Sequence, residues 1–209
     1  MWSPFAIAVL LSSVVSASPY SANSEPASAR VFTEDLSVSV PEPTSAVFFG
    51  PPRRAVVKLV PGSDDGVSGT LYISSVNRPY AGVIISGQVS GLKPGLHGFH
   101  VHMEGALGDQ CKDAKGHFNP DMAEHSGPKD QQRHAGDLGN IIAHEYGPTN
   151  IYIVDRLITL GDGAKNDIAG RAIVIHAGED DLGLGGNEES KKTGNAGSRL
   201  VCGIIQLNN

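Results

Sequence analysis

Short runs in which apolar and polar residues alternate recur along most of the chain after residue 54. A period of two is the geometry of a β-strand, in which successive side chains point to opposite faces. Gly, Pro, Asn or Asp residues bound most of these runs, as is typical of turns between strands. The pattern predicts strands over residues 55–60, 68–73, 83–89, 96–103, 138–143, 150–154, 172–175 and 199–207.

Two long stretches, residues 104–136 and 177–197, show no such period. Loops of that length in a compact domain need something to order them, such as a bound metal or a disulfide. Long helical periodicity is absent from the chain. We therefore predict an all-β domain, built as an eight-stranded antiparallel Greek-key flattened barrel (an immunoglobulin-like sandwich) with two long functional loops.

The first quarter of the chain differs from the rest in composition and lacks most of the alternating pattern. Residues 1–17 combine an uncharged apolar core with small residues at the end, which is typical of a secretory signal peptide and too short to span a bilayer. Residues 18–54 are rich in Ser, Ala and Pro, and we interpret them as an N-terminal extension or linker in which residues 31–40 could add an edge strand. The folded domain is then predicted to span residues 55–209, in a protein secreted to the extracellular space.

Composition narrows the class of partner. The chain has 209 residues and a formal net charge of −6, which is enough for one domain with a full core. The mild acidity and the lack of basic runs argue against nucleic acid as a partner, and no later segment is long and apolar enough for a membrane span. Secretion into an oxidising compartment favours a disulfide between Cys111 and Cys202, with two unpaired buried thiols as the alternative.

The candidate metal ligands of the chain are several histidines and one carboxylate. His100 and His102 lie on the same face of the predicted strand 96–103, so both can reach one ion. Further candidate ligands follow in the first loop and beyond it: His117, His125, His134, Asp137 and His176. Imidazole suits copper and zinc, and three imidazoles with one carboxylate suit tetrahedral zinc. The set predicts two metal ions with His117 placed to serve both, although Asp137 could instead only cap a turn.

Two histidines fall outside this pattern. His97 lies on the opposite strand face from His100 and His102, so we expect a structural role that ties the strand to a loop. His144 stands beside Glu145 and Tyr146 in a polar segment, and we expect it to be exposed to solvent.

Several long motifs occur in a fixed order along the chain. They are GLHGFHVH (95–102), GHFNP (116–120), GPKD (127–130), RHAGDLGN (133–140), GRAIVIH (170–176) and DDLGLGGNEESKKTGNAGSRLVCG (180–203). With these motifs, residues 55–209 resemble the copper/zinc superoxide dismutases. The resemblance implies an antioxidant enzyme outside the cell that dismutates superoxide anion with one copper and one zinc ion per subunit.

The resemblance also implies a role for individual residues. It places the copper ligands at His100, His102, His117 and His176, and the zinc ligands at His117, His125, His134 and Asp137. His117 would bridge both metals and exchange a proton during the reaction, and Arg199 would receive the anion above the copper. Asp180 would join a copper ligand to a zinc ligand, His100 to His125, unless its neighbour Asp181 takes that part.

The remaining implied roles concern the two loops. Cys111 would bond to Cys202 and anchor the first loop beside Arg199. A second set would shape the electric field at the entrance, or else act only as solvated surface charges: Glu188, Glu189, Lys192 and Thr193.

The sequence leaves two questions open: whether the protein forms a homodimer, and whether it is an enzyme or only binds metal. Members of the family are often homodimers. Met103 and Glu104 are more polar than the apolar surface that many of those dimers use, so a homodimer is one of two open alternatives. Residues 168–170 could also contribute to such a dimer interface. The alternative function is a secreted copper- and zinc-binding protein without dismutase activity. A metal chaperone of this fold would carry an added Cys-x-x-Cys motif, which this chain lacks.

Overall fold

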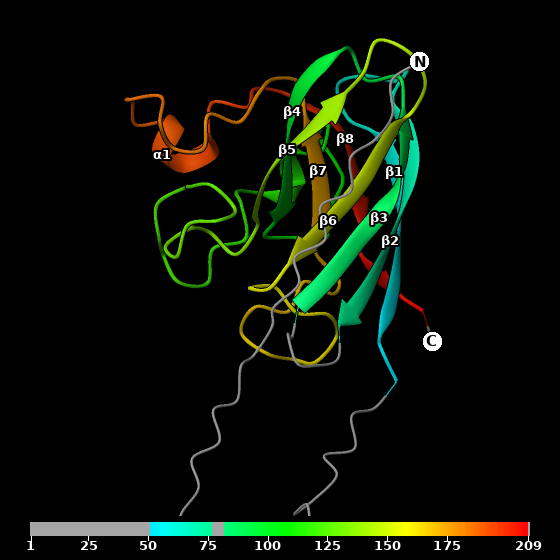
Figure 1. The fold of residues 1–209 in the computed structure, drawn as a ribbon, viewed down its shortest axis with the longest axis vertical. Helices are drawn as coiled ribbons and strands as arrows, with labels where there is room; N and C mark the ends of the chain where they lie inside the picture. Colours follow the sequence, from blue (N-terminus) through cyan, green and yellow to red (C-terminus); the bar gives the residue numbers. More distant parts are fainter. Residues whose placement is uncertain (1–50, 77–81, 209) are drawn as a thin grey trace, which may run out of the picture. The chain divides into compact units, whose positions relative to one another are not determined.

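The computed structural model describes residues 51–76 and 82–208, which form a β-rich domain (Figure 1). Its helical parts are one 3-10 turn, η1 (Lys112–Ala114), and a four-residue helix, α1 (Ser190–Thr193). The strands are β1 (Arg54–Pro61), β2 (Ser68–Val76), β3 (Gly82–Ser90), β4 (Gly95–His102), β5 (Asp137–Ala143), β6 (Thr149–Asp155), β7 (Ala172–His176), β8 (Arg199–Ile204) and β9 (Gln206–Leu207). The predicted strands are confirmed, with bounds that differ by one to three residues except in the last.

All strand pairs are antiparallel, in the order β5-β4-β7-β8-β1-β2-β3-β6. Strands β3 and β4 follow each other in the chain but are not neighbours in the sheet, which makes the topology a Greek key in a nearly closed barrel. The last predicted strand is interrupted at Ile205, whose backbone instead bonds to Gly170 and Arg171. Beyond the interruption, β9 pairs with β1.

The barrel core determines which face of each strand is free for chemistry. On β4, Phe99 and Val101 are fully buried among the apolar side chains of the other strands. Because side chains alternate along a strand, His100 and His102 point away from that core. Ile168 is also fully buried in the core, so this residue is not available to the apolar dimer surface considered from the sequence.

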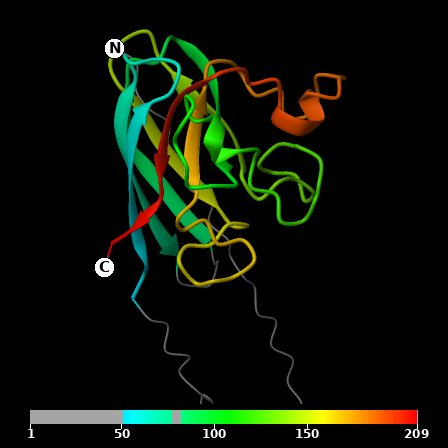
Figure 2. The same ribbon diagram turned by 180° about the vertical axis from the view of Figure 1, so that it is seen from behind.

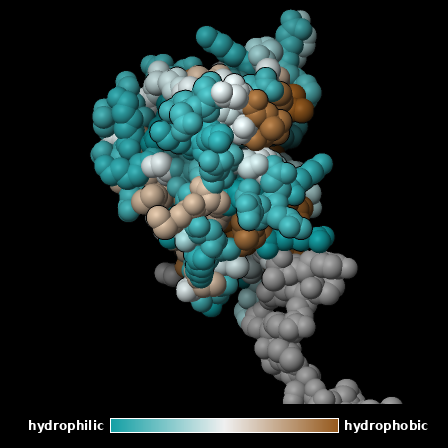
Figure 3. All heavy atoms as spheres, turned by 90° about the vertical axis from the view of Figure 1, so that its left-hand side faces the viewer, coloured by the Kyte–Doolittle hydropathy of each residue, from teal (hydrophilic) through white to brown (hydrophobic). Residues whose placement is uncertain are grey.

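Both long loops lie on one side of the barrel, beside β4, β5 and β7 (Figures 1 and 2). The backbone N–H of His125 in the first loop donates to the carbonyl oxygen of Lys191 in α1, 2.8 Å away, and so joins the two loops. Viewed from this side, the surface is mostly hydrophilic (Figure 3).

Cys111 and Cys202 form a disulfide, as predicted, with a sequence separation of 91 residues. It packs in a small buried cluster with Ala114, Ala172 and Val174. The bond fixes the first loop to β8 close to Arg199.

Some expectations from the sequence lie outside the described residues: the signal peptide at 1–17, the extension up to residue 50 and the edge strand at 31–40. Among the residues that the structure describes, no helix has the length and apolar character to cross a bilayer.

Replacing both cysteines by serine should lower the free energy of unfolding of the metal-free protein by about 4–5 kcal/mol, because the bond closes a long loop in the unfolded chain. Guanidinium titration of both proteins measures the difference. A double variant with unchanged stability would show that the bond adds nothing to the fold.

Candidate metal centre

Two groups of buried side chains meet at His117. The first cluster consists of His100, His102, His117 and His176, and the second cluster of His117, His125, His134 and Asp137. Within each cluster, one possible ligand atom per residue lies within 4.8 Å of all the others. The structure therefore brings together both ligand sets that the sequence predicts, and it shares His117 between them.

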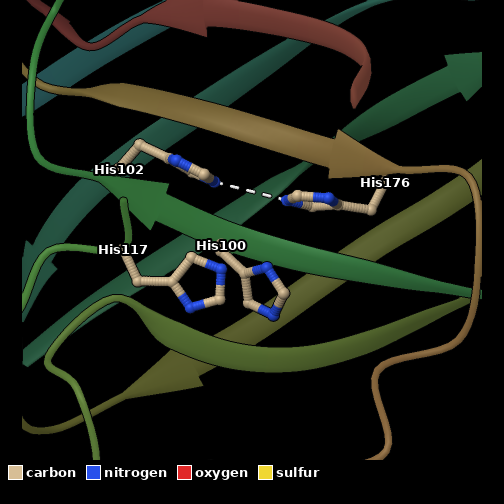
Figure 4. Close-up of side chains that lie close together, drawn as sticks. All are labelled: His100, His102, His117 and His176. Carbon is tan, nitrogen blue, oxygen red and sulfur yellow. Dashed lines mark hydrogen bonds between the residues drawn. The ribbon is translucent and has the colours of Figure 1, made fainter. Parts of the chain in front are cut away.

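The first cluster is assembled from two adjacent strands and a loop. His100 and His102 come from β4, and His176 is the last residue of β7, which pairs with β4. His117 is held beside β4 by an isolated backbone bridge to His102. The four rings lie close together, with the Nε2 atoms of His102 and His176 3.3 Å apart (Figure 4).

In three of these rings, the nitrogen that points away from the cluster has a fixed acceptor. Nδ1 of His102 donates to the carbonyl oxygen of Lys115 at 2.8 Å, and Nδ1 of His176 donates to that of Gly197 at 3.1 Å. Nε2 of His100 donates to a carboxylate oxygen of Asp180 at 2.8 Å. A neutral imidazole that donates from one nitrogen presents a lone pair on the other, so these contacts aim a lone pair at the cluster.

Two buried nitrogens in the first cluster have no hydrogen-bond partner among the described residues: Nδ1 of His100 and Nε2 of His117. Unpaired buried polar atoms are costly and call for an explanation. Four imidazole nitrogens facing one point are a fitting donor set for copper, so the residues fit the metal that the fold implies.

The second cluster surrounds one carboxylate oxygen. Oδ1 of Asp137 lies 2.8 Å from Nδ1 of His117, 2.9 Å from Nδ1 of His125 and 3.1 Å from Nδ1 of His134. The other oxygen of Asp137 accepts the backbone N–H groups of His134 and Ser126. Three imidazole nitrogens and one carboxylate oxygen match a tetrahedral zinc site.

Asp180 joins the two clusters. Its Oδ2 accepts from Nε2 of His100 at 2.8 Å, and its Oδ1 accepts from Nε2 of His125 at 2.7 Å. The neighbouring Asp181 instead bonds to Ser190 and Asn195. The geometry therefore favours Asp180 over Asp181 as the linking carboxylate.

Two residues outside the candidate ligands position Asp180 or leave room for it. The side-chain amide of Asn140 makes a pair of 2.8 Å hydrogen bonds with the backbone of Asp180. Gly194 has φ of +66°, and a Cβ at that position would lie 1.9 Å from Oδ1 of Asp180. A glycine in a motif is a general signal of close approach, but what it approaches is visible only in the fold.

A buried ion pair stabilises the backbone of the segment that carries His134 and Asp137. Arg133, next to His134, pairs with Asp155 at the end of β6, and both are buried. The same guanidinium donates to the carbonyl oxygens of His134, Ala135 and Asp137. No sequence pattern indicates this pair, because the two residues are distant in the chain and follow no motif of spacing.

Arg199 stands beside the first cluster. It is the first residue of β8 and pairs in the sheet with His176. Its Nη1 donates to the carbonyl oxygen of Cys111 at 2.6 Å, and its Nη2 to that of Lys115 at 2.5 Å. Because the Lys115 oxygen also accepts from His102, a single carbonyl connects the guanidinium to the cluster.

The backbone of Lys115 is unusual. Its φ of 64° and ψ of −149° fall in a region that is essentially restricted to glycine, and a side chain there costs about 1–3 kcal/mol. The turn from Asp109 to Cys111 also has positive φ at three consecutive residues.

The four residues expected to shape the entrance field lie in and before α1, outside both clusters. Glu188, Glu189 and Lys192 are exposed, and the hydroxyl of Thr193 donates to Glu189 at 2.7 Å. Of the two other histidines, His97 contacts the carbonyl oxygens of His176 and Lys93 at 2.8 Å each, which fits a structural role. His144 is exposed, as predicted.

Burial controls the charge of the first cluster. It lowers the pKa of His100, His102 and His117, and neighbouring imidazoles lower the pKa of His100 and His102 further. Burial, with His117 nearby, also lowers the pKa of His176 to about 3. Metal ligands must be deprotonated to bind, so these shifts keep the lone pairs available at neutral pH.

In the second cluster, the pKa of His125 is raised, in contrast to the lowered pKa values of the first cluster. Burial alone would lower its pKa, but the carboxylate of Asp137 at 2.9 Å and the hydrogen bond to Asp180 outweigh that effect and raise the pKa of His125 to about 9. Burial opposes ionisation of Asp137, yet bonds from three imidazoles hold the pKa of that carboxyl well below its usual range. A metal that binds here must displace a proton from His125.

Comparison with known proteins agrees with this geometry. Residues 67–205 match the sequence model of the family described as copper/zinc superoxide dismutase (SODC). A solved crystal structure, that of the clock protein EA4, is similar, with a TM-score of 0.68 and 39% sequence identity, over 76% of this chain and 97% of that chain.

Zinc binding to the metal-free protein should tighten by about tenfold per pH unit from pH 6.5 toward pH 9, since the metal displaces one proton from His125. The sign follows from the raised pKa: below about 9 the folded, metal-free protein holds that proton, so a lower pH favours the metal-free form. Calorimetry in buffers of different ionisation enthalpy measures both the affinity and the proton released.

Asp180→Asn provides the variant for this test, because it removes one of the two carboxylates that raise the pKa of His125. It should weaken zinc binding about 10- to 100-fold, as expected for the loss of a partner that orients a ligand, and it should release fewer protons. Asp181→Asn is the matched control and should leave both quantities unchanged. Equal effects of the two substitutions would assign the linking role to neither residue.

Proposed function

Because the chain belongs to the copper/zinc superoxide dismutase family, we propose that it dismutates superoxide to oxygen and hydrogen peroxide outside the cell, as an antioxidant defence. The observation that carries this proposal is the complete first cluster beside Arg199, joined through His117 to a complete second cluster. A protein that only stored metal would not need a guanidinium fixed next to its metal ligands.

The donor sets support copper in the first cluster and zinc in the second, one of each per subunit. When bound, copper supplies the one-electron exchange between Cu(II) and Cu(I) that the reaction requires, whereas zinc has a single oxidation state. In sum, one superoxide loses an electron and leaves as O₂, and a second superoxide gains that electron and two protons and leaves as H₂O₂.

Arg199 binds the incoming anion in this proposal. Two carbonyl oxygens hold its guanidinium in a fixed plane beside His102 and His176, and a planar fork of N–H donors suits a small oxyanion. The protein carries a formal net charge of −6, so attraction of a negative substrate has to be local. Glu188, Glu189, Lys192 and Thr193 are proposed to shape that local field from the second loop.

His117 takes up and releases a proton during the reaction in this proposal. Its Nδ1 is engaged at Asp137, while its buried Nε2 has no hydrogen-bond partner among the described residues. Nε2 is therefore the atom that takes up a proton and gives it to the reduced substrate. Asp180 keeps His100 and His125 oriented throughout, and the second cluster keeps the first loop ordered.

We also propose that residues 1–17 direct secretion and that residues 18–54 form an extension ahead of the domain. The disulfide supports an oxidising compartment, where such bonds persist. A homodimer remains the proposed assembly, with Met103, 43% exposed, at the position that many dimers of the family use.

Arg199→Ile should reduce the rate of superoxide decay on the order of tenfold or more with both metals still bound, because it removes the local positive charge. Pulse radiolysis with metal analysis of the same samples measures the decay rate and the metal content together.

His176→Ala, which removes one nitrogen of the first cluster, should abolish the decay. A fully metal-loaded natural sequence without any decay would leave the alternative, a secreted metal-binding protein.

Expression of the full chain in a secreting eukaryotic cell should release protein whose N-terminus lies near residue 18. Sequencing of the N-terminus and assay of the medium test this prediction, with a chain that lacks residues 1–17 as the control. Retention of both proteins inside the cell would contradict the proposed localisation.

A further inference from the structure

Lys115 occupies a backbone conformation that glycine adopts without strain. The residue ends η1 with φ of 64° and ψ of −149°, and Gly116 follows it directly. Residues held in such regions persist only where the surrounding structure determines them, and they gather at functional sites. The side chain at this position therefore needs a reason.

The backbone itself has a clear reason for its conformation. The Lys115 carbonyl oxygen accepts from Nη2 of Arg199 at 2.5 Å and from Nδ1 of His102 at 2.8 Å, while its N–H donates to the Lys112 carbonyl oxygen at 3.0 Å. Turning the peptide to relieve the strain would break contacts with the guanidinium and with the cluster. Glycine would satisfy the same three contacts, so they do not explain the lysine.

The side chain adds a positive charge near Arg199, which lies beside the first cluster. Lys115 is exposed, and no carboxylate pairs with it among the described residues, whereas Lys112 in the same turn lies 3.5 Å from Asp109. Because the Lys115 carbonyl accepts from the guanidinium of Arg199, the ammonium of the same residue lies on the order of one Debye length from that guanidinium, about 8–10 Å. An anion that approaches Arg199 therefore passes through the field of Lys115.

We propose that Lys115 is a further anion-guiding residue, which works with Arg199 to draw small monovalent anions to the first cluster. It acts at a distance, through its charge, and the strain of its backbone is retained because glycine would lack that charge. In a protein with a formal net charge of −6, each local positive charge near the site offsets the repulsion from the rest of the surface. For superoxide as the anion, this inference rests on the proposed function.

The test compares Lys115→Gln and Lys115→Glu with Lys58→Gln in the copper- and zinc-loaded full chain. Lys58 is an exposed residue of β1 that pairs with Thr70 and belongs to neither cluster, so it matches the change in net charge. At low ionic strength, Lys115→Gln should slow superoxide decay about twofold and Lys115→Glu about fourfold, as expected for unit charges about 10 Å apart in water. High salt should remove both differences, and Lys58→Gln should match the natural sequence.

Azide affinity, measured by the visible absorption of the copper-loaded protein, gives a readout that does not depend on dismutation. Azide should bind about twofold more weakly to Lys115→Gln than to the natural sequence at low salt. If the natural sequence shows no dismutation but azide still follows the charge at residue 115, the proposed function fails and the guiding role stands. Unchanged rates and unchanged azide affinities in both Lys115 variants would overturn the guiding role alone.

Lys115→Gly tests the strain independently. It should raise the melting temperature of the metal-free protein by a few degrees, since it relieves the backbone strain, and it should lose rate and azide affinity as Lys115→Gln does. A lower melting temperature in Lys115→Gly than in the natural sequence would show that lysine is kept for stability and would refute this part of the inference.

Discussion

The burial of six imidazoles with two carboxylates at one side of a barrel is the constraint on which the rest of this structure depends. Polar groups without partners are unfavourable in such a place, so each ring nitrogen needs a hydrogen-bond acceptor, a proton or a metal ion. The loops supply most of the acceptors: the carbonyl oxygens of Lys115, Gly197 and Ala123 and the carboxylate of Asp180. The loops are thus ordered by the histidines as much as the histidines are positioned by the loops.

The two clusters also depend on each other electrostatically. Burial lowers the pKa values in the first cluster, while Asp137 and Asp180 raise that of His125 in the second. Negative charge is therefore concentrated on the side of the second cluster, and the first cluster faces Arg199. This asymmetry leaves one side of the pair suited to holding a cation firmly and the other side suited to meeting an anion.

The alternation of residues was sufficient to predict the strands, because half-buried strands impose a period of two on the sequence. Residue type and position were also sufficient to place His100 and His102 on one strand face and to suggest two metal ions, whereas the assignment of each ligand to the first or the second cluster followed from the resemblance to the family. The supporting contacts were not predictable in this way. Lys115 acts on Arg199 and His102 through a backbone carbonyl, which every residue has. Asn140 holds Asp180 from 40 positions away in the chain, and Gly194, 14 positions away, leaves the space that its carboxylate occupies. Such contacts depend on how the loops close, and no local pattern encodes that.

The strained turn next to Arg199 follows from the same constraint. To present the carbonyl oxygens of Cys111 and Lys115 to one guanidinium, the chain adopts positive φ at residues 109–111 and again at residue 115. Strain of this kind persists only if other interactions hold the segment, and here the disulfide to Cys202 joins the turn to β8, the strand that begins with Arg199. The disulfide and the arginine are therefore two attachments of one turn to one strand. Loss of either should loosen the other, and the position of the guanidinium beside the first cluster depends on both.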